Sequence, residues 1–148
     1  MKALLQRVSR ASVEVDAKPV GSIDTGLLVL LGLEQGDSLA NGRRLLDKLL
    51  DYRVFPDAQE RMNLSVRDVS GGVLLVSQFT LAASTRKGLR PSFSAAMPPA
   101  EAEVLYVQLL DLLRELHPVV SAGVFGADMQ VSLTNDGPVT FLLEVAPD

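Results

Sequence analysis

The sequence contains no cysteine among its 148 residues and only one histidine, His117. Without cysteine, disulfides, thiolate metal ligands and cysteine nucleophiles are all excluded. A zinc site would then depend almost entirely on carboxylates, which zinc rarely accepts. His117 precedes Pro118 at the expected end of a helix, where an imidazole commonly faces the terminal carbonyl groups. We therefore expect neither a metal nor a cofactor, and a structural role for His117.

Long apolar segments are also absent. The longest strongly apolar stretch, residues 26–33, is far shorter than the roughly 20 residues that span a bilayer. The N-terminal segment has no long apolar run followed by a small-residue cleavage site. These features predict a cytoplasmic protein without a membrane partner.

A general excess of positive charge is absent as well, because the formal net charge is −4. This charge argues against a protein that coats nucleic acid with a broad basic surface. The densest basic cluster in an expected loop comprises Arg86, Lys87 and Arg90. It is either an ordinary solvated loop or a local contact with RNA.

Common catalytic motifs are missing too. The sequence has no G-x-S-x-G elbow, no phosphate-binding G-x-x-x-x-G-K-[ST] loop and no G-x-G-x-x-G after a strand. The usual esterase, nucleotide and dinucleotide functions therefore lose their main support.

The residues that are present predict one domain, 1–148, of the α/β or α+β class. Hydrophobic residues make up 47% of the chain, enough for one substantial core. Apolar periodicity predicts a mixed sheet and two helices, and turn residues predict hairpins at 17–21 and 134–138. The second helix should carry a buried stripe of Leu105, Leu109, Leu112 and Leu116. Strands are expected over 2–16, 26–33, 72–79, 119–125, 129–133 and 139–145, and helices over 37–53, capped by Asp37 or Ser38, and 98–116.

Two polar segments stand out against this pattern. Ser77, Gln78, Phe79 and Thr80 lie where a buried strand opens into a polar loop, and could cradle a polar substrate. A strand end that satisfies its own hydrogen bonds is the alternative. The second segment, 135–140, contains Asn-Asp-Gly-Pro and is equally well explained as a tight hairpin.

In this order and spacing, the two segments resemble the signature motifs of the D-aminoacyl-tRNA deacylase family. The resemblance covers nearly the whole chain and implies a barrel-like core of mixed sheets with two packed helices. No single motif is specific alone, but their joint occurrence is. Further matching segments are Gln6-Arg7-Val8, residues 26–32, Met62-Asn63-Leu64, Arg90-Pro91-Ser92-Phe93 and residues 127–133.

The resemblance implies a homodimer in which Gly137 and Pro138 of one subunit reach into the pocket of the other. It implies a cis peptide between them, with carbonyl oxygens that exclude an L side chain and leave room for a D side chain. Arg7 resembles the arginine that helps hold this loop, although a surface charge on an edge strand is the alternative. The remaining residues that the resemblance assigns to the substrate are Phe125, Ala127 and Met129.

The implied reaction is hydrolysis of the ester of D-aminoacyl-tRNA, which proofreads chirality in translation. Glycyl-tRNA, including glycine mischarged on tRNA-Ala, should also be cleaved because glycine has no side chain to reject. Thr80 is the obvious nucleophile by position, but a threonine hydroxyl is inert without a base. We therefore prefer a mechanism in which Ser77, Gln78 and the backbone amides around Phe79 and Thr80 position the ester and stabilise the oxyanion. The terminal 2′-hydroxyl of the tRNA would help to activate water.

Two other functions remain open from the sequence. The first is a small-molecule esterase or amidohydrolase that uses Thr80. The second is an RNA-binding module without catalysis. Phe79 and Phe125 could stack on the terminal adenine or simply fill the core.

Overall fold

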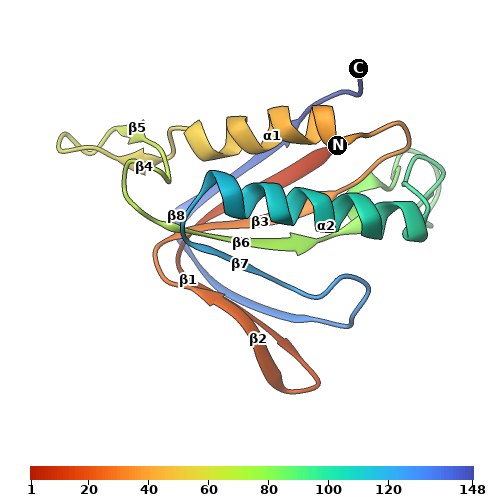
Figure 1. Cartoon of the computed structure of the whole chain (residues 1–148), viewed down its shortest axis with the longest axis horizontal. Helices are drawn as coiled ribbons and strands as arrows, with labels where there is room; N and C mark the ends of the chain where they lie inside the picture. The colour runs from red at the N-terminus through yellow and green to blue at the C-terminus, as the bar shows by residue number, and fades with distance from the viewer.

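The sheet is organised around one long strand, β1 (Lys2–Val15), in the computed structural model of residues 1–148 (Figure 1). Along one edge, β1 pairs antiparallel first with β3 (Gly26–Gly32) and then with β2 (Lys18–Ile23). Along its other edge it pairs antiparallel with β8 (Gln130–Glu144). β1 is therefore an interior strand over most of its length.

Two parallel strands extend the sheet beyond β3. β6 (Gly72–Ser77) runs parallel to β3, and β7 (Val120–Ala122) runs parallel to β6. Both faces of β3 and β6 are buried, as expected for parallel strands covered on each side. The predicted central strands are confirmed here.

The sheet curls until its two ends meet. The backbone N–H of Ser22 on β2 donates a hydrogen bond to the Ser121 hydroxyl on β7 at 3.3 Å. A Cβ atom at Gly21 would lie 2.6 Å from the carbonyl oxygen of Ala122, so only glycine permits this approach. The result is a nearly closed, barrel-like sheet, as the resemblance implied.

Two helices cover one face of this sheet (Figure 1). α1 (Leu39–Asp51) begins after Ser38, whose backbone N–H donates to Asn41 Oδ1 at 2.6 Å. α2 (Pro99–Leu116) has proline at its first position, where a missing N–H costs no helical hydrogen bond. The predicted class, a mixed α/β domain with two helices, is confirmed.

The hydrophobic core has two parts. The larger lies between the helices and the sheet, and the smaller, with seven buried residues, fills the barrel-like half. The buried stripe of α2 includes Leu105 and Leu109 as predicted, but continues through Leu113. Leu112 and Leu116 are only partly buried at its border, because the 3.6-residue period turns them away from its centre.

The predicted hairpin at 134–138 is wrong. β8 is one continuous strand through this region, and its pairing with β1 shifts register between Gln6 and Val8 and again before Arg10. The Asn-Asp-Gly-Pro segment is therefore a bulge within a strand. Turn chemistry is local, and here the long β1 supplies pairing partners on both sides of the bulge.

Two smaller turns also differ from expectation. The first hairpin turns at Asp16 and Ala17, which both have positive φ, so that Pro19 already lies in β2. Between α1 and β6, where no strand was expected, the structure contains a two-stranded hairpin of β4 (Phe55–Pro56) and β5 (Met62–Leu64).

His117 ends α2 as predicted but does not face the helix carbonyls with its ring. Its Nε2 donates to the carbonyl oxygen of Gly71 at 2.7 Å, and the residue is buried. The imidazole thus ties the end of α2 to the start of β6. No helix in the structure is both long and apolar enough to cross a membrane.

Candidate active site

An open cavity of about 680 Å³ lies at the carboxyl end of β6. Ligands commonly bind beyond the carboxyl ends of parallel strands, where loops diverge. Gln78 directly follows β6: its N–H still donates to Leu31 O on β3 at 2.7 Å, whereas its carbonyl oxygen accepts from Leu81 N at 3.2 Å. The latter bond belongs to the short 3₁₀ helix η1 (Phe79–Ala82). The chain therefore turns away from the sheet at the cavity floor.

The cavity brings together six residues that the sequence assigned to the site. They come from the end of β6 and from the loop between β7 and β8. They are Ser77, Gln78, Phe79, Phe125, Ala127 and Met129.

Other lining residues were missed from the sequence. They are mostly apolar and lie directly after β3, in the segment before α2 and in the first turn of α2. Apolar residues in a loop follow no period, so no pattern distinguishes those outside the helix from ordinary core residues. They include Leu33, Phe93, Met97, Pro98, Pro99 and Ala102.

Thr80 is exposed and does not line the cavity. Its hydroxyl oxygen accepts a hydrogen bond from Gln78 Nε2 at 2.5 Å. Through this contact Thr80 can orient the amide of Gln78, a role that differs from that of a nucleophile.

None of the residues that line the cavity has an acidic or basic side chain. The one histidine is buried against Gly71, at the opposite end of β6. Nowhere in the structure do three histidine, aspartate or glutamate side chains gather closely enough to hold a metal ion. The cavity therefore offers hydroxyl, amide and backbone groups, but no side chain to act as general base.

Aromatic side chains form two walls of the cavity. Phe79 is 62% exposed and stacks at a tilt on Phe93, with 5.2 Å between ring centroids. Phe125 packs on Tyr106, with 5.6 Å between centroids. The Tyr106 hydroxyl donates to Leu75 O at 3.1 Å, and burial raises the pKa of Tyr106 to about 12. Tyr106 therefore remains a neutral donor that fixes the wall carrying Phe125.

Gly137 and Pro138 project from the bulge on β8 and are exposed. The peptide bond between them is cis, and Gly137 has φ +138°. Asn135 braces the bulge, since its Oδ1 accepts from Val139 N at 3.0 Å and its Nδ2 donates to Thr140 Oγ1 at 2.9 Å. The projecting pair therefore stands on a hydrogen-bonded base.

Arg7 lies beneath this bulge, with a side chain only 11% exposed. Its Nε donates to Asp136 O at 3.0 Å, and its Nη1 donates to Val54 O at 2.7 Å. The planar guanidinium suits two carbonyl acceptors held in different directions. Arg7 thus connects the bulge to the segment that follows α1.

The bulge and the cavity lie apart within the chain. Arg7 pairs with Leu27 on β3, which pairs with Val73 near the start of β6, whereas the cavity begins at Ser77. The path from β8 through β1 and β3 to β6 crosses three strand spacings, and Ser77 lies four residues beyond Val73 along β6. These offsets place the two features roughly 15–20 Å apart. Neither Gly137 nor Pro138 lines the cavity of its own chain.

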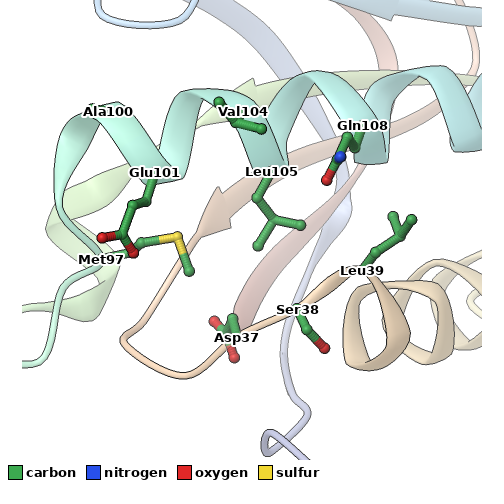
Figure 2. A pocket seen from close by; sticks show the side chains of 9 residues that line it. All are labelled: Asp37, Ser38, Leu39, Met97, Ala100, Glu101, Val104, Leu105 and Gln108. Atoms are coloured by element: carbon green, nitrogen blue, oxygen red, sulfur yellow. The ribbon is translucent and has the colours of Figure 1, made fainter.

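A second, more open cleft lies between the start of α1 and α2 (Figure 2). Asp37 at its base already accepts hydrogen bonds from the Met1 amine at 3.0 Å and from Asn41 Nδ2 at 2.8 Å. Its carboxylate is therefore occupied within the fold. Several of the other lining residues, such as Leu39 and Val104, are exposed apolar side chains. The other polar side chains that line the cleft are Ser38, Glu101 and Gln108.

The chain is similar to known proteins over nearly its whole length. Residues 4–144 match the family model described as D-Tyr-tRNA(Tyr) deacylase. A D-aminoacyl-tRNA deacylase of Pseudomonas paraeruginosa is 63% identical over 97% of this chain and 99% of its own length. One from Cellvibrio japonicus is 59% identical over 98% of this chain and 99% of its own.

Solved structures share the fold. That of a c-Myc DNA Unwinding Element Binding Protein has a TM-score of 0.94 and 42% identity over the whole of both chains. That of a probable eukaryotic D-amino acid tRNA deacylase has a TM-score of 0.82 at 17% identity, over 96% of this chain and 97% of its own, which shows the fold alone. The family match and the close relatives together show that the chain belongs to the D-aminoacyl-tRNA deacylase family of hydrolases.

Proposed function

We propose that this chain hydrolyses the ester of D-aminoacyl-tRNA to a free D-amino acid and tRNA, and that it excludes L-aminoacyl groups. One observation carries the mechanism: the cavity at the end of β6 contains no titratable side chain. Such a site suits a reaction in which positioned amides stabilise charge and the substrate supplies the proton relay.

In the proposed reaction, a water oxygen attacks the ester carbonyl carbon. The first N–H groups of a helix have no intrahelical acceptor, so that of Phe79, which lines the cavity at the start of η1, is suited to the oxyanion, with the N–H of Thr80 next to it in the chain. The bond between the carbonyl carbon and the ribose oxygen then breaks. The proton lost by water passes through the neighbouring 2′-hydroxyl to that oxygen, leaving a carboxylic acid and a ribose hydroxyl.

The proposed stereochemical filter comes from a second copy of the chain. The exposed bulge of Gly137 and Pro138 is braced yet distant from its own cavity, which favours insertion into the cavity of a partner. The two carbonyl oxygens of this pair would face the substrate α-carbon. An L side chain would collide with them, whereas a hydrogen or a D side chain would not.

Arg7 fits this proposal as the residue that positions the bulge. Its hydrogen bond to Asp136 O lies directly before Gly137, and its side chain is largely buried. We infer that Arg7 acts through the bulge rather than on the substrate.

A steric filter of this kind has a consequence for glycine. Glycine offers no side chain to the carbonyl oxygens, so glycyl-tRNA, including glycyl-tRNA-Ala, should be cleaved as well. Persistence of glycyl-tRNA with excess enzyme would contradict a purely steric filter.

The proposed function is tested with matched D-tyrosyl-tRNA and L-tyrosyl-tRNA, with chelator present throughout. Loss of the D ester alone would establish the activity and its chirality without a metal. Loss of both esters would remove the filter, and loss of neither would overturn the proposed reaction.

A second candidate is nucleic-acid binding without turnover. It is favoured by the likeness to the c-Myc DNA Unwinding Element Binding Protein, which is 42% identical to this chain. This candidate predicts tRNA binding and no loss of either ester in the same assay. Rapid cleavage of simple D-amino-acid esters without RNA would instead favour a small-molecule esterase.

A further inference from the structure

We propose that the loop of residues 84–94, together with Phe79, binds the single-stranded nucleotides that precede the terminal adenosine of the tRNA. This inference rests on the proposed function, because it assumes that an aminoacylated 3′ end enters the cavity at β6.

Positive charge is concentrated in this loop, and acidic residues are absent from the surrounding sequence. The chain carries 18 acidic and 14 basic residues, yet no aspartate or glutamate occurs between Asp68 and Glu101. Within that stretch stand Arg86, Lys87 and Arg90, all exposed. An acidic protein therefore presents a local surface of positive charge without acidic neighbours along the chain, as a local phosphate-binding site requires.

The backbone presents these cations outward. Ser84 and Ser92 close the loop with reciprocal hydrogen bonds, from Ser84 N to Ser92 O at 2.8 Å and from Ser92 N to Ser84 O at 3.0 Å. Gly88 at the tip has φ +67° with open space around it, and the Leu89 side chain is fully exposed. The two hydrogen bonds between Ser84 and Ser92 hold the ends of the loop together, while its tip is exposed to solvent.

None of the three cations makes an ion pair or a side-chain hydrogen bond. The salt bridges of the molecule involve the Met1 amine or other arginines, such as Arg43 with Asp47 and Arg67 with Asp51. The guanidinium and ammonium groups of the loop are therefore free to contact phosphates.

The loop joins the cavity through an aromatic pair. Phe93 follows the closing residue Ser92 and stacks on Phe79, and both rings line the cavity. Their exposures of 41% and 62% are high for phenylalanine. Exposed aromatic rings beside free cations match the surfaces that bind single-stranded nucleic acid, where bases stack and phosphates pair with cations.

The first test is binding of a fluorescent single-stranded RNA that ends in ACCA, measured by anisotropy. The triple variant Arg86→Ala, Lys87→Ala, Arg90→Ala should bind at least about tenfold more weakly. Each lost phosphate contact should lower the slope of log K against log salt by about 0.7, or about 2 for all three. The matched control neutralises three exposed cations elsewhere, Arg10, Lys18 and Lys48.

A second variant tests the aromatic platform separately from charge. Phe93→Leu keeps an apolar side chain but removes the ring. It should weaken binding of the oligonucleotide without changing the salt slope. Equal binding by wild type, the triple variant and the control would overturn the proposal, as would equal losses in the triple variant and the control.

The kinetic test compares D-tyrosyl-tRNA with D-tyrosyl-adenosine, which carries the ester but no preceding nucleotides. The triple variant should lose kcat/KM on the tRNA and keep it on the adenosine ester. Equal losses on both substrates would overturn the proposal, because the loop would then act on the cavity itself. Failure of the wild type on both substrates would contradict the proposed function instead, and the oligonucleotide result would still decide the role of the loop.

Discussion

The cavity at the end of β6 and the bulge on β8 differ in almost every physical respect. The cavity is concave, largely apolar and assembled from four separate segments of the chain. The bulge is convex, exposed and built within one strand on a base of side-chain hydrogen bonds. In the proposed function, the cavity holds the ester and stabilises the developing charge, whereas the carbonyl groups of the bulge distinguish D from L. The two features would then be complementary parts of one site.

The largest expected effect concerns the chemistry of the cavity. Because no lining side chain can act as a base, replacing the terminal adenosine of D-tyrosyl-tRNA by 2′-deoxyadenosine should slow hydrolysis by about 10²–10⁴-fold. Thr80→Ala, tested on the ordinary substrate, should slow it by less than about tenfold, since a lone hydroxyl without a base contributes little. Single-turnover rates measure both. Loss of activity only in the Thr80 variant would support a covalent route.

The next effect concerns the bulge. A Cβ atom at Gly137 would lie 2.6 Å from Val139 Cγ2 and 3.0 Å from Val139 N, at a φ that L residues rarely adopt. Gly137→Ala should therefore displace the carbonyl groups and lower kcat/KM for D-tyrosyl-tRNA by about 10²-fold. Gly36→Ala is the matched control, because Gly36 has φ +88° but only ordinary contacts. Similar activities of the two variants would show that the bulge takes no part in the reaction.

A smaller effect is expected at Arg7, the residue proposed to position the bulge. Arg7→Ala removes the donors to Asp136 O and Val54 O and should lower kcat/KM by about tenfold, with a loss of discrimination between D and L esters. Arg7→Lys should rescue little, since one ammonium group cannot replace the planar guanidinium at both acceptors. Arg10→Ala, an exposed arginine on the same strand, serves as control. Unchanged D/L discrimination in Arg7→Ala would contradict the positioning role.

The smallest effect concerns stability of the cavity wall. Tyr106→Phe removes one of the two donors to Leu75 O, which also accepts from Gly123 N at 3.0 Å, and should lower the free energy of unfolding by about 0.5–1.5 kcal/mol at pH 7. Because burial raises the folded-state pKa of Tyr106 from 10.0 to about 12, its contribution is fully present below about pH 10 and is lost as pH rises towards 12.

Urea unfolding of wild type and Tyr106→Phe at pH 7 and pH 11 measures both effects. Tyr52→Phe is the control, since Tyr52 packs on Phe141 and its hydroxyl makes no hydrogen bond in the structure. The difference between wild type and Tyr106→Phe should shrink at pH 11. Equal stability of the two tyrosine variants at pH 7 would contradict a role for the Leu75 contact.

The regular elements of the fold were largely predictable from the sequence. The doubly buried strand at 26–33 and the helix that begins at Pro99 carry strong local signals, and the structure contains both. The continuity of β8 was not predictable, because Asn-Asp-Gly-Pro has the composition of a turn. Only the presence of β1 along both halves of β8 makes a bulge more favourable than a hairpin.

The site was predictable to a similar extent. Ser77 and Gln78 could be placed at a cavity because they end a buried strand. The contacts of Arg7 with Val54 and Asp136 depend on pairing between the two ends of the chain, which no local pattern reveals. The separation of the bulge from its own cavity depends on strand register, which the sequence leaves undetermined.

The most direct test of a site shared between the cavity of one chain and the bulge of its partner is a mixed dimer of two defective chains. This dimer is purified through two different affinity tags. One chain carries Gly137→Ala with an intact cavity, and the other carries Gln78→Ala, which removes an amide that lines the cavity and should impair hydrolysis, with an intact bulge. If the bulge acts in the partner's cavity, one of the two sites in the mixed dimer is fully intact, and about half of the wild-type rate on D-tyrosyl-tRNA should return. A mixed dimer no more active than either defective parent would contradict insertion across the interface.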